Sequence, residues 1–228
     1  MSSTAVTTTK FVFEPHPTPS VAVLGDDGEL KFPVHRIYCV GRNYADHVKE
    51  MGGDANLDKP VFFCKPADAV VASGTSIPYP LATKNLHYEA ELVIALHSGG
   101  KSIPADQVLE HVYGYAVGID LTRRDLQAIA KEKGQPWDSA KAFDLSAPIG
   151  PITVGPNSVK ADAKISLQVN KVQKQSSTID KMIYSIPEII SILSEEFVLQ
   201  AGDLIFTGKT IRILFILFSL QESTIENI

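Results

Sequence analysis

Two acidic residues, Glu89 and Glu91, stand two positions apart at the start of an apolar run that ends at Leu96. The run has the composition of a strand that enters a core, and side chains two apart on a strand share a face. Two carboxylates on one face repel each other unless a cation lies between them. Asp120, after a second strand-like run, offers a third oxygen donor. Three carboxylates suit a hard cation such as Mg2+ or Mn2+; the alternative is that Glu89 and Glu91 line a solvated strand face.

A second pair that could do chemistry is His47 and Glu50, in a segment of helical composition, 42–51, that two glycines end. Residues three apart on a helix lie on one face. A carboxylate beside an imidazole raises the imidazole pKa and fixes its tautomer, as a general base requires. The alternative is an exposed pair on a surface helix. Lys141, between small and aromatic residues, is expected to be partly buried, where its charge could stabilise an enolate or a carboxylate.

A helix is predicted over 121–133, with Thr122 as N-cap and Gly134 at its C-terminal end. Arg123 and Gln127, four positions apart, would share a face near the carboxylates. Arginine there would suit a substrate that carries a carboxylate, or would simply be solvated or pair with acidic neighbours.

The remaining pattern predicts the elements that position these residues. We expect an N-terminal arm with a small hairpin over 1–36 and a short helix over 186–193, opened by Ser185 as N-cap. Asn170 is expected in a hairpin turn. Further strands are predicted at 37–40, 61–64, 148–154, 165–169 and 204–208.

Composition narrows the function classes. The chain has 228 residues, enough for one substantial core, and a formal net charge of −5 without a basic cluster. These values argue against nucleic acid or an anionic membrane as partner. No apolar run is long enough for a membrane span, and the Ser/Thr-rich N-terminus does not resemble a secretory signal, so we expect a cytoplasmic protein. Cys39 and Cys64 lie in separate apolar runs, which predicts reduced core residues rather than a disulfide.

Five motifs together resemble the fumarylacetoacetate hydrolase family, and within it the fumarylpyruvate hydrolase or acylpyruvase branch. Their order and spacing match the family over residues 37–208. The motifs are Gly41-Arg42-Asn43-Tyr44-Ala45-Asp46-His47, His87-Tyr88-Glu89-Ala90-Glu91-Leu92, the run from Gly114 to Asp125, Lys141-Ala142-Phe143-Asp144, and Gly202-Asp203-Leu204-Ile205-Phe206-Thr207-Gly208.

The resemblance implies an α+β fold, a mixed β-roll with peripheral helices that assembles as a homodimer. It implies a divalent metal, Mg2+ or Mn2+, on Glu89, Glu91 and Asp120. His47 and Glu50 would form a dyad that activates water. The resemblance also places Lys141 in the pocket and implies substrate contacts for Arg124, Gln127 and Thr207.

The expected reaction is hydrolysis of the carbon–carbon bond of a 2,4-dioxo acid, with fumarylpyruvate as the expected substrate and fumarate and pyruvate as the products. An oxaloacetate decarboxylase or tautomerase is the alternative within the same fold. After Gly208 the chain departs from the family, which continues with Thr-Pro and a glycine-rich loop. Residues 209–228 therefore form an atypical tail, consistent with a retained intron or a frameshift, and a non-catalytic isoform is a third possibility. A substitute strand at 211–220 is the structural alternative.

Overall fold

The structure is a computed structural model that describes residues 10–25, 29–44 and 59–209, together with the backbone of 220–226. Its helices are α2 (Arg124–Glu132), α3 (Asp138–Lys141) and α4 (Ile186–Glu196), with short 3-10 helices at Ala67–Ala69, Val108–His111 and Ile179–Lys181. Its strands are β1 (Ser20–Ala22), β2 (Lys31–Pro33), β3 (Ile37–Gly41), β4 (Val61–Lys65), β5 (Val70–Ala72), β6 (Leu86–His87), β7 (Ala90–Leu96), β8 (Val112–Ile119), β9 (Thr122–Arg123), β10 (Ala147–Ile149), β11 (Thr153–Val154), β12 (Lys164–Val169), β13 (Val172–Thr178), β14 (Leu204–Phe206) and β15 (Leu220–Glu226).

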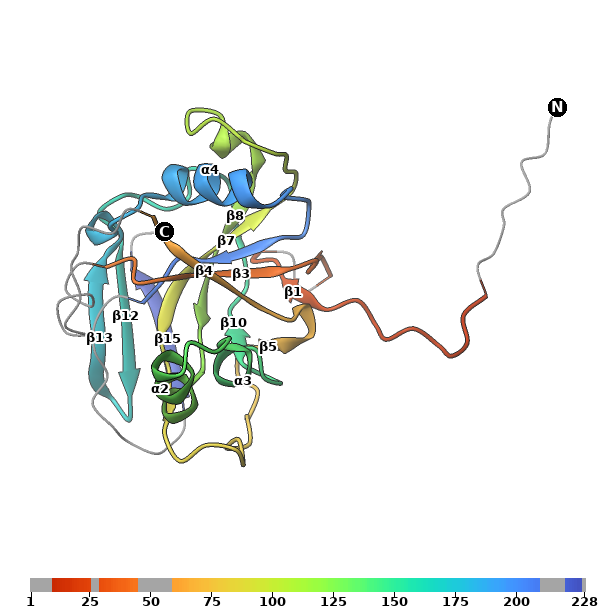
Figure 1. The fold of residues 1–228 in the computed structure, drawn as a ribbon. Coiled ribbons are helices and arrows are strands. Elements are labelled where there is room, and N and C mark those ends of the chain that lie inside the picture. The colour runs from red at the N-terminus through yellow and green to blue at the C-terminus, as the bar shows by residue number, and fades with distance from the viewer. Residues whose placement is uncertain (1–9, 26–28, 45–58, 210–219, 227–228) are drawn as a thin grey trace.

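One mixed sheet carries the fold. Its strand order is β4-β3-β14-β7-β8-β10-β5, with β11 paired to β8. Strands β3 and β14 run parallel, as do β5 and β10, whereas β7 is antiparallel to both β14 and β8. A second sheet, β13-β12-β15, stands beside it, and the helices lie at the periphery (Figure 1). The described chain therefore has the α+β architecture, a mixed sheet with peripheral helices, that we expected.

The strand β7 is buried along its whole length because both faces of the sheet are covered. Ile94 and Leu96 join a core cluster with Ile189 and Leu193 of α4 on one face. Val93 and Ala95 point the other way, into a cluster that includes Phe32 of the arm. This alternation is the two-residue period of a strand. It makes β7 and its neighbours a rigid support for whatever lies at their ends.

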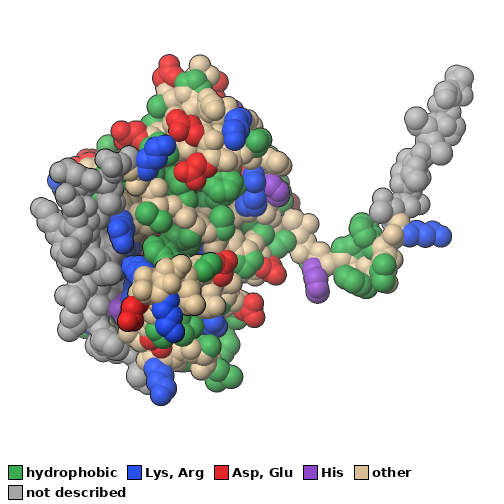
Figure 2. Space-filling model, in the orientation of Figure 1, with side chains coloured by type: hydrophobic (Ala, Val, Ile, Leu, Met, Phe, Trp, Pro, Cys, Tyr) green, Lys and Arg blue, Asp and Glu red, His purple; other side chains and the backbone are tan. Residues whose placement is uncertain are grey.

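The arm forms the expected hairpin. Strands β1 and β2 pair antiparallel, with Val21 opposite Phe32, and both residues are buried against the main sheet. Before this hairpin the chain extends away from the body (Figures 1 and 2), and the side chains of Phe11, Val12 and Phe13 are exposed there.

Several local expectations are confirmed. Ser185 begins α4 with a capping box, in which Glu188 accepts hydrogen bonds from Ser185. Asn170 and Lys171 both have positive φ angles, 51° and 64°, and turn the chain between β12 and β13.

Other expectations were wrong. Thr122 is not the N-cap of the helix, because it lies on β9 and α2 begins at Arg124. Cys64 is exposed rather than in the core, because it lies on β4, which is an edge strand of the main sheet in the described part of the chain. The segment predicted as one strand over 148–154 forms two short strands, β10 and β11.

Parts of the N-terminal and C-terminal expectations lie outside the described residues. These include most of the helix predicted over 42–51, with His47 and Glu50, and nearly all of the substitute strand predicted over 211–220. A strand does form in the tail, but at Leu220–Glu226, where β15 pairs antiparallel with β12. Among the described residues, no helix is long and apolar enough to cross a membrane.

Candidate active site

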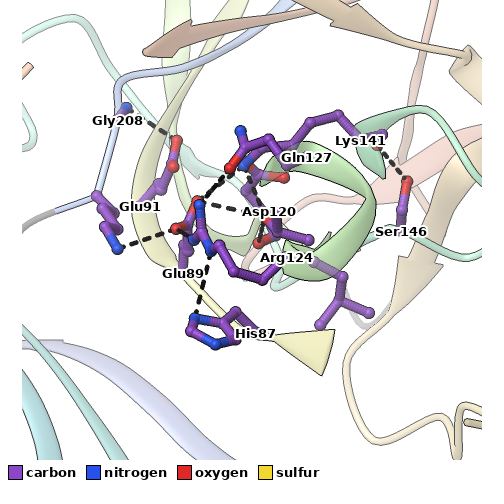
Figure 3. A network of polar contacts seen from close by, with 12 residues as sticks. His87, Glu89, Glu91, Asp120, Arg124, Gln127, Lys141, Ser146 and Gly208 are labelled. Carbon is purple, nitrogen blue, oxygen red and sulfur yellow. Dashed lines mark hydrogen bonds and ion pairs between the residues drawn. The ribbon is translucent and has the colours of Figure 1, made fainter. Parts of the chain in front are cut away.

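Three buried carboxylates meet where β7 begins and β8 ends (Figure 3). Glu89, Glu91 and Asp120 are 4%, 2% and 1% exposed, and one ligand oxygen from each lies within 4.8 Å of the others. Ala90, between the two glutamates, packs in a hydrophobic cluster on the opposite side. The Asp120 N–H donates to the Glu89 carbonyl at 2.8 Å, which fixes the two strand ends side by side. Burial rules out the alternative of a solvated strand face.

Two glycines allow the backbone to come this close. A Cβ on Gly118, which pairs with Glu91, would lie 2.5 Å from the Phe206 ring. Gly208 has a φ of 96°, a conformation that L side chains rarely adopt, and its N–H donates to Glu91 Oε2 at 2.8 Å. The conformation of Gly208 therefore holds the Glu91 carboxylate in place.

Cationic side chains surround the carboxylates. Lys141 Nζ lies 2.8 Å from Glu89 Oε2 and also contacts an oxygen of Asp120. Lys65 Nζ lies 2.9 Å from the other Asp120 oxygen and donates to the Leu121 carbonyl at 3.2 Å. Lys141 additionally donates to the Thr122 hydroxyl at 2.6 Å. These contacts compensate buried negative charge that would otherwise be strongly unfavourable.

The carboxylates differ in their electrostatics. Burial alone would raise the pKa of Glu89, but Lys141, Lys209 and Arg124 hold this pKa well below its usual range. Burial and the neighbouring Asp120 and Glu89 raise the pKa of Glu91 well above its usual range. Although burial opposes it, Asp120 and Glu89 raise the pKa of Lys141. The cluster therefore has two carboxylates paired with cations, Glu89 and Asp120, and a third, Glu91, that its acidic neighbours repel.

Arg124 and Gln127, from the first turn of α2, are brought to the site as expected. The Arg124 guanidinium contacts Glu89 Oε1, donates to the Gln127 side-chain oxygen and lies 3.4 Å from His87 Nδ1 (Figure 3). Burial, followed by the positive charge of Arg124, lowers the pKa of His87 to about 4, so His87 is neutral near pH 7. A neutral imidazole can accept this hydrogen bond from an arginine.

A polar pocket opens above the carboxylates. Its lining combines acidic ligands, cations and two aromatic rings: Val40, Gly41, Arg42, Phe63, Glu89, Glu91, Asp120, Arg124, Gln127, Lys131, Trp137, Lys141 and Lys209. Thr207 is not among these residues. Its hydroxyl is buried and donates to the Leu92 carbonyl at 3.0 Å, so its expected contact with substrate gains no support from the side-chain position.

Two lysines at the site, Lys65 and Lys209, were not predicted from the sequence. Lys65 ends β4 and is buried, although the rest of this strand is partly or fully exposed, so no local pattern in the sequence pointed to its place at the site. Lys209 follows Gly208 directly, and its ammonium lies 3.1 Å from Glu89 Oε1. From the sequence, Lys209 is only the first residue of the atypical tail. His47 and Glu50 lie outside the described residues, so their place relative to the pocket stays a prediction.

The donor set fits a divalent cation. Carboxylate oxygens are the ligands that Mg2+ and Mn2+ prefer, and opposite ligands of an octahedral Mg2+ are about 4 Å apart. Adjacent ligands of such an ion are about 3 Å apart, so the three oxygens, which lie within 4.8 Å of one another, would draw closer together around one cation. Burial first, and then the charges of Asp120 and Glu89, raise the pKa of Glu91, and a cation would relieve the repulsion among these carboxylates.

Comparisons with known proteins agree with this geometry. Residues 36–211 match the profile of the fumarylacetoacetate hydrolase C-terminal domain. The chain is 43% identical to fumarylpyruvate hydrolase of Ralstonia over 155 residues, 68% of this chain and 81% of that protein. It is 42% identical to the mitochondrial oxaloacetate tautomerase of Homo sapiens over 175 residues, 75% of this chain and 78% of that protein.

A solved structure is similar over nearly the whole chain. Fumarylpyruvate hydrolase from Pseudomonas aeruginosa, crystallised in complex with Mn2+ and pyruvate, superposes with a TM-score of 0.86. The two sequences are 46% identical, and the match covers 95% of this chain and 94% of the other.

Proposed function

Because this chain belongs to the fumarylacetoacetate hydrolase family, we propose that it hydrolyses the carbon–carbon bond of an acylpyruvate, a 2,4-dioxo acid, with fumarylpyruvate as the first candidate. The observation that carries the proposal is the group of three buried carboxylates at the base of a cation-lined pocket. Such a pocket suits an anionic substrate whose adjacent oxygens chelate a metal. The similarity to two fumarylpyruvate hydrolases supports the choice of substrate.

In this proposal Glu89, Glu91 and Asp120 hold the metal, Mg2+ or Mn2+. A bound cation would polarise the carbonyl oxygens of the dioxo acid as a Lewis acid. Lys141, whose ammonium reaches between Glu89 and Asp120, stabilises negative charge that develops on the pyruvate fragment. Lys65 holds the Asp120 carboxylate from the other side and so fixes its orientation.

The rim of the pocket binds the acid. Arg124 and Gln127 are joined to each other by a hydrogen bond and both line the pocket, where we propose that they bind the substrate carboxylate. Phe63 and Trp137, whose ring centroids are 5.9 Å apart, offer an apolar wall for the acyl group. Thr207 retains only the role that the family resemblance implies.

A hydrolase also needs a base for water. We propose His47, oriented by Glu50, for this step: the imidazole takes a proton from the water that attacks the distal carbonyl. The bond between C3 and C4 of the dioxo acid then breaks, its electron pair goes to the pyruvate enolate, and the proton held by His47 is returned to C3 to give pyruvate. Both residues lie outside the described part of the chain, so this assignment rests on the family resemblance.

The oxaloacetate tautomerase among the relatives favours a second candidate, tautomerisation or decarboxylation of oxaloacetate at the same site. That chemistry uses an enolate but no attacking water. A His47→Asn variant therefore separates the two, because it should lose hydrolysis of fumarylpyruvate while the metal and Lys141 remain in place.

The experiment follows the enol absorbance of fumarylpyruvate and measures pyruvate release, with Mg2+ or Mn2+ and again after EDTA. Metal-dependent release of equimolar fumarate and pyruvate supports the proposal. Assays with oxaloacetate in parallel show whether the second candidate reaction is faster or slower than hydrolysis of fumarylpyruvate. Turnover that persists in EDTA, or that survives in Asp120→Asn, would contradict it. Exposed Asp162→Asn is the matched control.

Further expectations from the resemblance belong with this proposal. We propose a catalytic region over 37–208 preceded by the arm, a homodimer, and a cytoplasmic location. Light scattering of the purified chain tests the dimer. A chain with a family-like sequence after Gly208 should be assayed beside the present one. If only that chain is active, the tail at 209–228 makes this product a non-catalytic isoform.

A further inference from the structure

Both oxygens of the Glu89 carboxylate already have cationic partners. Oε2 lies 2.8 Å from Lys141 Nζ and accepts a hydrogen bond from the Thr122 hydroxyl at 3.4 Å. Oε1 contacts Arg124, and Lys209 Nζ lies 3.1 Å from the same atom. In the metal-free chain, each oxygen of the Glu89 carboxylate therefore already has two partners. A divalent cation that takes an oxygen of Glu89 must therefore displace or crowd one of these positive charges.

Two of these cations are held by several other groups. Lys141 also contacts Asp120 and the Thr122 hydroxyl, and its side chain is only 4% exposed. Arg124 also donates to Gln127 and lies against His87. Moving either one would break several buried contacts, which is energetically unfavourable.

Lys209 is held least. Within the described residues, Glu89 Oε1 is the one acidic group that its ammonium contacts. It lies just beyond Gly208, whose positive φ directs the chain after β14 toward the carboxylates. Its side chain is 6% exposed, so the charge is poorly screened by solvent. A lysine has four rotatable carbon–carbon bonds along its stem, which allow its ammonium to leave while the backbone stays fixed.

We propose that Lys209 is an internal competitor of the metal: its ammonium neutralises Glu89 in the metal-free chain and must leave Glu89 Oε1 before a divalent cation binds. The proposal rests on the metal site of the proposed function. Lys209 thereby stabilises the metal-free protein and weakens its affinity for the cation. It follows that this chain requires a higher metal concentration than the same chain without a charge at position 209.

The test measures Mn2+ binding directly, from the electron paramagnetic resonance signal of free Mn2+ in titrations of the full chain, without any activity assay. The variants are Lys209→Met, which keeps the length of the stem, and Lys209→Gln, which keeps a polar end. Lys160→Met is the matched control, because Lys160 is exposed and its replacement by Met removes the same formal charge. Glu89→Gln reports loss of the ligand itself.

We expect Lys209→Met and Lys209→Gln to lower the Mn2+ Kd by about tenfold, while Lys160→Met leaves it within about twofold. In EDTA both Lys209 variants should melt at a lower temperature than the parent chain. An unchanged or higher Kd in both variants, with binding by the parent chain intact, would overturn the role of Lys209 alone. If neither the parent chain nor the Lys209 variants bind Mn2+, the metal site fails, and the proposed function and this inference fail together.

Discussion

The Lys141 ammonium lies 2.8 Å from Glu89 Oε2 and also contacts Asp120, so one buried lysine joins the carboxylates of two strands. Glu89 immediately precedes β7, and Asp120 follows β8. The lysine comes from the end of α3. Its pKa is raised by both carboxylates although burial opposes this, so it remains charged. The site is thus held by charge compensation as well as by the sheet.

Lys141→Met should strongly destabilise the metal-free chain. Removing one partner of a buried ion pair leaves uncompensated charge, at a cost of about 3–5 kcal/mol. Urea unfolding in EDTA measures the loss. Saturating Mn2+ should recover part of it, because the cation neutralises the same carboxylates. Lys101→Met, at an exposed position, is the control and should change stability by less than about 0.5 kcal/mol. Equal stability of the two variants would contradict the compensating role of Lys141.

Glu91→Gln should separate stability from metal binding. Burial and the nearby Asp120 and Glu89 raise the pKa of Glu91, so a neutral amide is compatible with this position in the metal-free chain. Glutamine also keeps an oxygen that can accept the N–H of Gly208. We therefore expect melting in EDTA at the parent temperature or above it.

Glu91→Gln should also lose the rise in melting temperature that Mn2+ gives the parent chain. At a Mn2+ concentration a hundredfold above Kd, binding stabilises the parent chain by about 2.7 kcal/mol. Exposed Glu110→Gln should keep this rise. Differential scanning calorimetry with and without Mn2+ makes the comparison. A full Mn2+ shift in Glu91→Gln would show that this carboxylate is not a ligand.

The carboxylate group could be predicted from the sequence because its geometry is local. The period of a strand puts Glu89 and Glu91 on one side, and the pairing of two consecutive strands brings Asp120 beside them. The α+β class was implied by the family resemblance of the five motifs, not by these short-range patterns. The order of the sheet does not, because β3 pairs in parallel with β14, far away in the chain.

Other parts of the site depend on contacts that no local pattern contains. Lys65 reaches Asp120 from β4, and Lys209 reaches Glu89 from the position directly after Gly208, which has a positive φ. Thr122 has the residue type of a helix cap, but its pairing on β9 and its contact with Lys141 place it outside the helix. Tertiary contacts override local preference at this position.

Gly118→Ala should destabilise the fold although it changes no charged residue. The added methyl group would lie 2.5 Å from the Phe206 ring and 2.7 Å from a methyl of Val93, so the sheet must shift. Overpacking of this kind costs roughly 1–3 kcal/mol. Gly100→Ala is the control, since its methyl group would meet Ile103 at an ordinary 3.5 Å. Urea unfolding compares the two, and similar midpoints would show that the close approach at Gly118 is not required.

Gln175 lies on the second sheet, and its replacement by leucine should destabilise the carboxylate site on the main sheet. The Gln175 side-chain oxygen accepts the N–H of Ala90 at 2.8 Å, and Gln175 is buried on β13. Leucine has a similar size but no acceptor, and an unsatisfied buried N–H costs about 1–3 kcal/mol. Because Ala90 separates Glu89 from Glu91, its displacement should also raise the Mn2+ Kd.

Exposed Gln173→Leu, on the same strand, isolates the effect of the Ala90 hydrogen bond from that of an added apolar side chain. Chemical unfolding and Mn2+ titration of both variants then give two independent readings. A stable Gln175→Leu with parental Mn2+ affinity would mean that β7 keeps its position through its own pairings with β8 and β14. Loss of stability with unchanged affinity would assign Gln175 to the fold alone. Loss of both stability and Mn2+ affinity would show that the second sheet helps to set the spacing of the carboxylates.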